Sequence, residues 1–442
     1  MSFNYSNLMR LAGVALLNFV GVNMLWAAKG ADGMEYDLAD VGGASYSLEC
    51  KWMIPDIAEI TEVSKSTYRT NIFYYQGAVY LNIQYKYSKP ELEKFDAITG
   101  ESLGSHTIDW NGYEYSSRSA VYAGIDSDGE PYVASFGGPF AEGAEPFCIY
   151  PIEFTADGTP TAAGRYELEL LPHWYNGSPS VKGSVKSGHF SVAASVRDLE
   201  RISDVYQRPK TGVALWNVDS DKAAEIQAYA DALLSVTLAI PLEDNHVLIY
   251  DRSIQIRGLS EDYKGAIPTI FEITSDHTLK PISTFDGHID NEHGNGLTFF
   301  ELNCVPLMAY SAGNFLPSYA IAKMNDYPQL ENSDNLWKMS SDEFNRFSTC
   351  NNQQEGTMLA AVVAPDSSYA DLYLLTNSVS LSSYRIEYQS GELTDIAPLT
   401  IADTDSSATY YTLQGHKLTQ QPTSPGIYIL RKGSKVTKTI IP

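Results

Sequence analysis

The residues best suited to chemistry in this 442-residue chain gather in the segment 286–296. His288, Asp290 and His293 lie within six positions of one another and carry the nitrogen and oxygen donors that suit a divalent metal ion. Glycines on both sides of the group are equally typical of a flexible solvent loop. The loop is the favoured interpretation, and a metal site at these three residues is the sharper hypothesis.

A second polar segment, Asp126-Ser127-Asp128-Gly129, begins like a calcium-binding loop. The bidentate glutamate that completes such a loop is missing farther along the chain. Two strand-like stretches flank the segment, so a plain hairpin turn is favoured.

The sequence lacks the motifs of the common enzyme classes. The sequence contains no glycine-rich phosphate loop, no His-Glu-x-x-His and no Gly-x-Ser-x-Gly. We therefore assign no catalytic residue and predict no cofactor. Carboxylates paired for glycoside cleavage cannot be assigned from spacing when a site is assembled from separate repeats.

The elements that would position such residues are repeated hairpins, in which alternating apolar and polar residues run into Asp, Gly, Ser or Asn turns. Successive copies are 51 to 64 residues apart if the equivalent positions are Phe95, Phe154, Val218, Ile273, Met324 and Tyr388. Regularly spaced sheets in a chain of this size indicate a propeller. We predict an all-β, six-bladed propeller over residues 35–400, with seven blades as the alternative.

Two local features bear on this assignment. Residues 35–60 contain a strand without a full set of hairpins, so we expect this strand to complete the sheet begun by the last repeat and remove an open edge. The Ala-rich segment Lys222–Leu234 has the composition of a helix, but the repeat places a strand there. We expect the strand, because tertiary pairing overrides intrinsic propensity.

The amino-acid composition argues against some classes of binding partner. The net charge of -24 argues against a nucleic-acid backbone or an anionic membrane surface. Hydrophobic content of 44% is ample for a core. The four cysteines are scattered, which excludes the close pairs of a zinc knuckle or a thioredoxin-like site. Up to two disulfides are possible in an oxidising compartment, but buried thiols are favoured.

The first thirty residues differ from the rest. An apolar run, Leu11–Val22, follows Arg10 and precedes Ala27, Ala28 and Gly30. This pattern predicts a secretory signal peptide over residues 1–30. No later stretch is apolar for long enough to cross a bilayer, so no transmembrane span is expected in the mature chain.

The amino-acid composition changes again near residue 401. Residues 401–409 form a polar linker, and the tail at 410–442 carries five Lys and Arg residues but no Asp or Glu. An aromatic segment ending in a Gly turn (411–418), a Pro-Gly-Ile-Tyr-Ile strand (425–430) and a closing Lys-rich strand (435–441) follow one another. This tail resembles the C-terminal sorting domain of type IX secretion cargo in Bacteroidetes. The resemblance implies contact with the type IX export machinery, removal of the tail or its exchange for a surface anchor, and a secreted or outer-surface protein.

Three classes of function remain open. The first is a binding or scaffolding propeller whose ligand is a glycan or a protein, because the 30 Tyr and 6 Trp could stack on sugar rings or contact a protein. The second is a secreted polysaccharide hydrolase or lyase. The third is a purely structural surface protein. Whether the chain is an enzyme is left open, since a fold does not choose among these.

Overall fold

The computed structural model describes residues 36, 38, 45–61, 68–84, 90–114, 120–136, 147–168, 174–202, 209–219, 222–230, 233, 236–243, 245–251, 268–285, 294–312, 318–324, 334–339, 358–376, 380–390, 408–411, 422, 426–432 and 435–441. Within these ranges the chain is all-β, as predicted, and its one helix is the 3-10 turn η2 (Ile57–Glu59). No helix in the same ranges is long and apolar enough to span a membrane.

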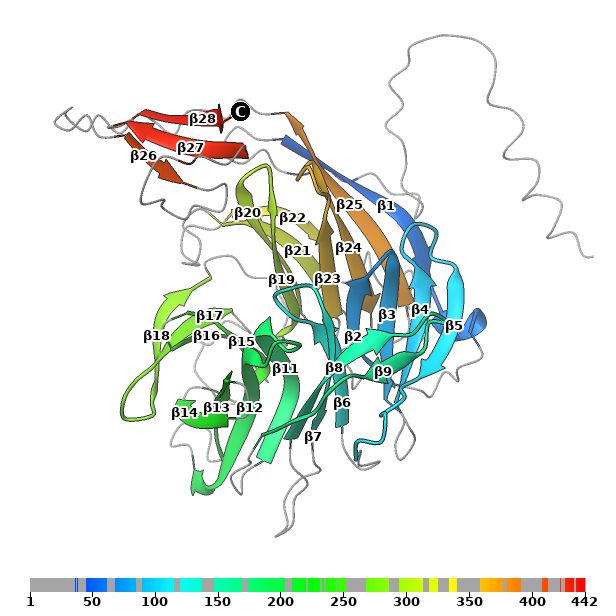
Figure 1. Ribbon diagram of the computed structural model, residues 1–442, viewed down its shortest axis with the longest axis vertical. Coiled ribbons are helices and arrows are strands. Elements are labelled where there is room, and N and C mark those ends of the chain that lie inside the picture. The colour runs from blue at the N-terminus through cyan, green and yellow to red at the C-terminus, as the bar shows by residue number, and fades with distance from the viewer. Residues whose placement is uncertain are drawn as a thin grey trace, which may run out of the picture.

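Four sheets of the body have the four or five strands of a propeller blade (Figure 1). The first contains β2 (Tyr68–Tyr75), β3 (Ala78–Gln84), β4 (Glu91–Asp96) and β5 (Ser102–Thr107). The second contains β6 (Ala120–Ile125), β7 (Pro131–Phe136), β8 (Phe147–Phe154), β9 (Pro160–Ala162) and β10 (Tyr166–Leu168). The third contains β19 (Gly294–Leu302), β20 (Val305–Ala312), β21 (Ser318–Lys323) and β22 (Asp334–Met339). The fourth contains β23 (Met358–Val363), β24 (Tyr369–Thr376), β25 (Ser380–Ser390) and β1 (Ser45–Ile54).

A fifth sheet of the body has eight strands in the order β14-β13-β12-β11-β15-β16-β17-β18. These strands are β11 (Trp174–Ser184), β12 (His189–Ile202), β13 (Pro209–Asp219), β14 (Lys222–Ala230), β15 (Val236–Pro241), β16 (His246–Asp251), β17 (Thr269–Ile273) and β18 (Leu279–Thr284). Strand pairing thus gives four separate blade-sized sheets, not the six predicted or the seven held as the alternative. The physical reason is that β11 and β15 pair in parallel and join two sets of four strands into one sheet.

The sheets form a propeller-like ring. The strands β2, β6, β11, β15, β19 and β23 contact one another in that order, and β23 contacts β2. The positions predicted to be equivalent do occupy equivalent places, because each lies at or beside the end of the third strand outward from this ring: Phe95 in β4, Phe154 in β8, Val218 in β13, Ile273 in β17, Met324 after β21 and Tyr388 in β25. The repeat inferred from sequence is therefore a repeat of structure.

The ring is closed by the strand expected to do so. β1 pairs antiparallel with β25, from Ser45 opposite Ser390 to Ile54 opposite Leu381. In Figure 1 the blue β1 accordingly lies beside the orange β25, although some 330 residues separate them in the chain. This pairing makes β1 the outermost strand of the sheet that β23, β24 and β25 begin, so the first strand of the body completes its last sheet.

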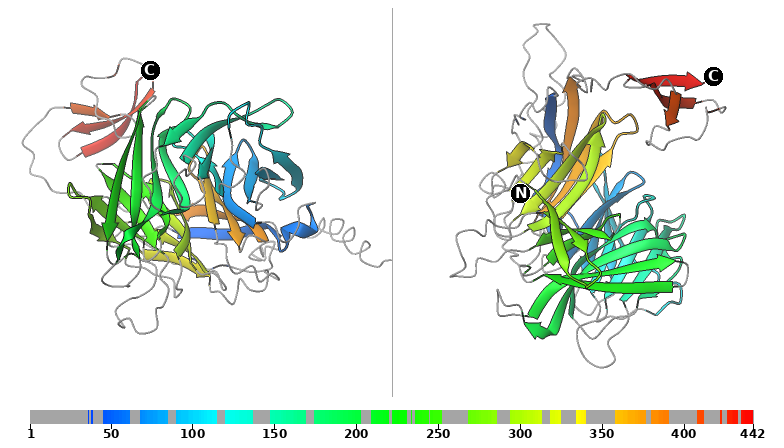
Figure 2. Two further views of the ribbon diagram at one scale, coloured as in Figure 1. Left: turned by 90° about the horizontal axis from the view of Figure 1, so that it is seen from below. Right: turned by 90° about the vertical axis from the view of Figure 1, so that its left-hand side faces the viewer.

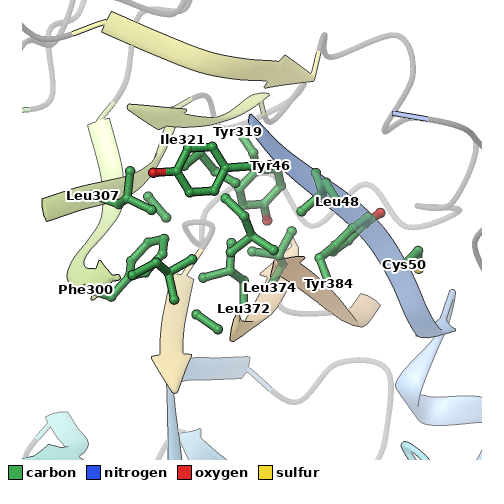
Figure 3. Packing of buried hydrophobic residues seen from close by; sticks show 14 residues of the cluster. Tyr46, Leu48, Cys50, Phe300, Leu307, Tyr319, Ile321, Leu372, Leu374 and Tyr384 are labelled. Atoms are coloured by element: carbon green, nitrogen blue, oxygen red, sulfur yellow. The ribbon is translucent and has the colours of Figure 1, made fainter. Parts of the chain in front are cut away.

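Hydrophobic residues fill the spaces between neighbouring sets of strands. The cluster in Figure 3 packs β1, β24 and β25 against β19, β20 and β21, with Tyr46, Phe300, Tyr319, Leu372 and Tyr384 among its members. Five further clusters of the described residues are built in the same way around the ring. Each side chain fully buried in such a cluster contributes about 1.5–3 kcal/mol relative to an exposed one.

At each of these junctions, a polar side chain of one set of strands is also hydrogen-bonded to a backbone carbonyl of the neighbouring set. The bonds run from Asn82 to Val121 (2.6 Å), Tyr132 to Pro179 (3.4 Å), His277 to Gln227 (3.1 Å), Tyr250 to Ser311 (2.8 Å), Tyr319 to Leu375 (3.5 Å) and Trp52 to Ala97 (3.0 Å). Such bonds fix the relative position of neighbouring sheets, which apolar packing alone leaves less specific.

The Ala-rich segment that begins at Lys222 is a strand, as expected. β14 pairs with β13 over nine residue pairs, from Thr211 opposite Ala230 to Asp219 opposite Lys222. The ladder pairs the backbone of Lys222–Ala230 with that of β13, which outweighs the helical preference of alanine in this part of the segment.

The tail forms a sheet of its own. β26 (Ala408–Tyr411), β27 (Gly426–Lys432) and β28 (Lys435–Ile441) pair antiparallel and lie apart from the body (Figures 1 and 2). The first tail strand begins two residues before the predicted boundary at 410. The predicted signal peptide at 1–30 and the first part of the linker, 401–407, lie outside the described residues.

Closure of the ring depends on how closely Trp52 of β1 packs on the turn after β4. An added Cβ at Gly100 would lie 2.7 Å from two ring atoms of Trp52, and the backbone there has φ +72°. Gly77 has a similar φ of +82°, but nothing lies within 4 Å of its would-be Cβ. We expect Gly77→Ala to cost about 1 kcal/mol through backbone strain alone. Gly100→Ala should cost about 1–3 kcal/mol more, because the indole must shift.

Equilibrium urea unfolding of the two variants measures this difference. Equal losses of unfolding free energy in Gly100→Ala and Gly77→Ala would mean that the Trp52 contact does not support the closure.

Candidate functional site

The residues proposed to bind a metal, His288, Asp290 and His293, lie in the connection between β18 and β19. This connection is outside the described residues, so the metal hypothesis stays a prediction. Elsewhere, the described part of the chain contains no group of three His, Cys, Asp or Glu side chains placed to hold a metal ion.

The segment Asp126–Gly129 forms the hairpin turn between β6 and β7, as favoured from sequence. Oδ1 of Asp126 accepts hydrogen bonds from the backbone N–H groups of Asp128 (2.9 Å) and Glu130 (3.0 Å). Its Oδ2 accepts from the N–H of Val185 (2.9 Å), in the turn between β11 and β12. The buried carboxylate therefore holds two turns of neighbouring sheets together.

Ser127 reinforces the same junction. Its Oγ accepts from the N–H of Gly183 (2.9 Å), and its own N–H donates to the carbonyl of Gly183 (3.1 Å). The two turns thus behave as one rigid unit.

This rigid unit carries part of a mixed polar and aromatic group that we call the Tyr75 cluster. Its members come from three consecutive sets of strands and are Tyr75 (end of β2), Gln76 (the turn after β2), Glu130 (the turn before β7), Glu153 and Phe154 (end of β8) and Lys186 (the turn after β11). The cluster brings aromatic, acidic, basic and amide side chains of three sets of strands together.

Hydrogen bonds and an ion pair connect the polar members. The Tyr75 hydroxyl lies 3.4 Å from Oε2 of Glu130 and accepts from Nε2 of Gln76 at 2.9 Å. Nζ of Lys186 lies 2.7 Å from Oε1 of Glu153, and both of these side chains are more than half exposed. The cluster is therefore open to solvent on one side and anchored on the other.

Electrostatics keep Tyr75 neutral and Lys186 positively charged at neutral pH. Partial burial, followed by the carboxylate of Glu130, raises the pKa of the Tyr75 hydroxyl. The hydrogen bond that Lys186 donates to the carboxylate of Glu153 raises the pKa of the Lys186 ammonium. Tyr75 consequently stays a neutral phenol that can donate and accept, and Lys186 stays a cation.

A column of packed aromatic rings supports Tyr75. The rings of Tyr75 and Phe154 stack with centroids 5.5 Å apart and planes at 24°. Phe154 contacts Tyr80 at 5.0 Å, and Tyr80 stacks on Phe73 at 5.1 Å. The half-buried Tyr75 is the outermost ring of this column.

The sequence did not single out this cluster. Its residues are spread from 75 to 186, and their proximity depends on how three sheets are placed around the ring. The one available signal was the Asp126 turn, which the structure places between Glu130 and Lys186.

The cysteines are thiols where they are described. Cys50 and Cys148 are buried and Cys304 is exposed, while Cys350 lies outside the described residues. Burial raises the pKa of the Cys148 thiol, which makes it a poor nucleophile. The preference for buried thiols is confirmed at Cys50 and Cys148 and is wrong at Cys304, which is exposed.

Comparison with known proteins adds little. No protein-family model matches the chain, and no curated protein matches its sequence. Among solved structures, the chain is similar to a DUF4623 family protein from Bacteroides eggerthii, with a TM-score of 0.48 and 10% identity over 80% of this chain and 78% of that chain. A likeness of that degree carries no argument about function. The fold and the cluster by themselves define a propeller-like all-β protein with a polar and aromatic group contributed by three neighbouring sets of strands.

The role of Asp126 as an anchor of the cluster can be tested by substitution. We expect Asp126→Ala to lower the free energy of unfolding by about 2–3 kcal/mol, because it removes charge-assisted bonds and leaves the buried N–H of Val185 without its acceptor. The matched control is Asp128→Ala in the same turn, where the side chain is exposed and the change should be within about 0.5 kcal/mol.

Chemical denaturation at equilibrium gives both values. A loss in Asp126→Ala no larger than that in Asp128→Ala would contradict the anchoring role.

Proposed function

We propose that the body is a six-bladed propeller in which the eight-stranded sheet comprises two blades. Within the part of the chain that the structure describes, the two halves, β11–β14 and β15–β18, are joined through two residue pairs, Ser178 with Leu238 and Pro179 with Ala239. Residues of β12, β13 and β14 also pack against residues of β15, β16 and β17 in one hydrophobic cluster, as separate blades do and strands of one flat sheet do not.

We further propose that the protein is a binding or scaffolding module whose ligand, a glycan or a protein, occupies the Tyr75 cluster. The observation that carries this proposal is the convergence of Tyr75, Glu130, Glu153 and Lys186 from three sets of strands. Ligand sites on propellers are assembled in this way from neighbouring blades. A secreted polysaccharide hydrolase or lyase is the alternative, because two carboxylates belong to the same cluster.

We also propose that the protein is secreted or displayed on the outer cell surface by way of the type IX machinery. The support is the sequence of residues 1–30, the resemblance of the tail to sorting domains, and the separate sheet that β26, β27 and β28 form. A sheet that pairs with no described strand of the body is free to be recognised and removed as a unit.

Export can be tested by truncation in a bacterial host that has a type IX system. We expect the full chain to reach the medium or the cell surface, and a chain that ends at Thr400 to be retained in the periplasm. Cell fractionation with immunoblotting measures the distribution.

The control is the unfolding temperature of the two purified chains, which should agree because the described tail strands pair only with one another. Equal export of both chains would refute the sorting role of the tail, and retention together with a lowered unfolding temperature would reveal a structural role instead.

A further inference from the structure

We infer that the Tyr75 cluster binds a neutral, hydroxyl-rich sugar ring. This inference rests on the proposed binding function and narrows its ligand from a glycan or a protein to one chemical class. The aromatic surface of the cluster, its hydrogen-bonding groups, its charge and its rigid base all favour such a ligand.

The aromatic part matches the apolar face of a sugar ring. Tyr75 ends the column of stacked rings that begins at Phe73, so its position is fixed by packing on Phe154. The C–H groups on one face of a pyranose pack well on such a ring, and the ring loses little conformational entropy on binding because it is already held.

The polar part matches sugar hydroxyl groups, each of which can donate one hydrogen bond and accept others. Glu130 and Glu153 supply acceptors, and Lys186 and Gln76 supply donors around the same ring. A hydroxyl group can therefore join the Lys186–Glu153 pair, donating to one partner and accepting from the other without separating them. Hydrogen bonds to charged groups are the stronger kind.

Charge favours a neutral ligand over an ionic one. The cluster contains two carboxylates and one ammonium group, and the whole chain carries a net charge of -24. A polyanionic polysaccharide would be repelled by this field. A cationic ligand would compete with Lys186, which already pairs with Glu153 at 2.7 Å.

A large protein partner fits the cluster less well. Protein interfaces are centred on buried apolar and aromatic anchors with depleted charge. The large apolar side chains most exposed among the described residues are elsewhere, at Ile60, Ile98, Leu103, Tyr113, Ile202 and Ile282.

The base of the cluster is rigid, which suits recognition of a small ligand. The carboxylate of Asp126 binds the backbone of Glu130 on one side and that of Val185, next to Lys186, on the other. The acidic and basic groups of the cluster are thereby held at a fixed separation before any ligand arrives.

Isothermal titration calorimetry with the full chain tests this inference. The probes are neutral oligosaccharides of glucose, xylose and mannose, an oligogalacturonate as the acidic sugar, and a lysine-rich peptide. We expect a neutral oligosaccharide to bind with an affinity that is insensitive to salt, since no net charge is neutralised.

Substitutions locate the site. We expect Glu130→Gln and Tyr75→Ala each to weaken binding at least about tenfold, the size expected for a lost charge-assisted hydrogen bond or a stacking ring. The matched control is Glu243→Gln, which removes the same charge from another exposed Lys–Glu pair, with Lys182, and should leave affinity unchanged. Unfolding temperatures verify that each variant is folded, and the near-isosteric Glu130→Gln keeps the test usable if Tyr75→Ala does not fold.

Each outcome has a separate meaning. Salt-sensitive binding of only the acidic sugar or the peptide, weakened by Glu130→Gln, would overturn the ligand class and leave the proposed site standing. Neutral sugar bound equally well by both cluster variants would overturn the site and leave the binding function standing. No binding of any probe would overturn the inference, and release of new reducing ends would replace the binding function by the hydrolase.

Discussion

The pairing of β1 with β25 is the constraint on which the rest of the body depends. A ring of twisted sheets is stable only if its first and last members meet, because otherwise two open faces and an unpaired edge remain. Here a ladder from Ser45 to Ile54 meets that need, with Trp52 bonded to the carbonyl of Ala97 in the first sheet. The first strand of the body thus belongs to its last sheet, so the unfolding of β1 and that of the other strands of this sheet affect each other.

Each junction between neighbouring sets of strands in the closed ring is stabilised by the same combination of interactions. Apolar side chains of two neighbouring sets of strands fill the space between them, and a polar side chain fixes their offset through a backbone carbonyl. Tyrosine is well suited to this role, since its ring is buried while its hydroxyl reaches an acceptor, as at Tyr250 and Tyr319. Part of the high tyrosine content therefore has a structural explanation.

The Tyr75 cluster illustrates how such a ring generates a site. The turns that carry Glu130 and Lys186 exist to reverse the chain, and the buried carboxylate of Asp126 joins them for the stability of the junction. The same bonds hold the turns of Glu130 and Lys186 together, while Tyr75 at the end of β2 contacts Glu130 and Glu153 at the end of β8 contacts Lys186. A rigid scaffold with polar turns is a common basis for recognition, and this one needs no dedicated loop for the groups that it brings together.

The sequence alone determined the all-β class, the places of the repeats, the strand identity of β14 and the closing role of β1. These features follow from alternation of apolar residues and from turn residues, which are local properties of the chain. Only the tertiary structure decided that β11 and β15 join into one eight-stranded sheet, because a pairing of two residues leaves no trace in periodicity. The tertiary structure alone also shows that the members of the Tyr75 cluster lie together. The proximity of residues 75, 130, 153 and 186 is set by the rotation from one sheet to the next, and no local sequence pattern encodes that rotation.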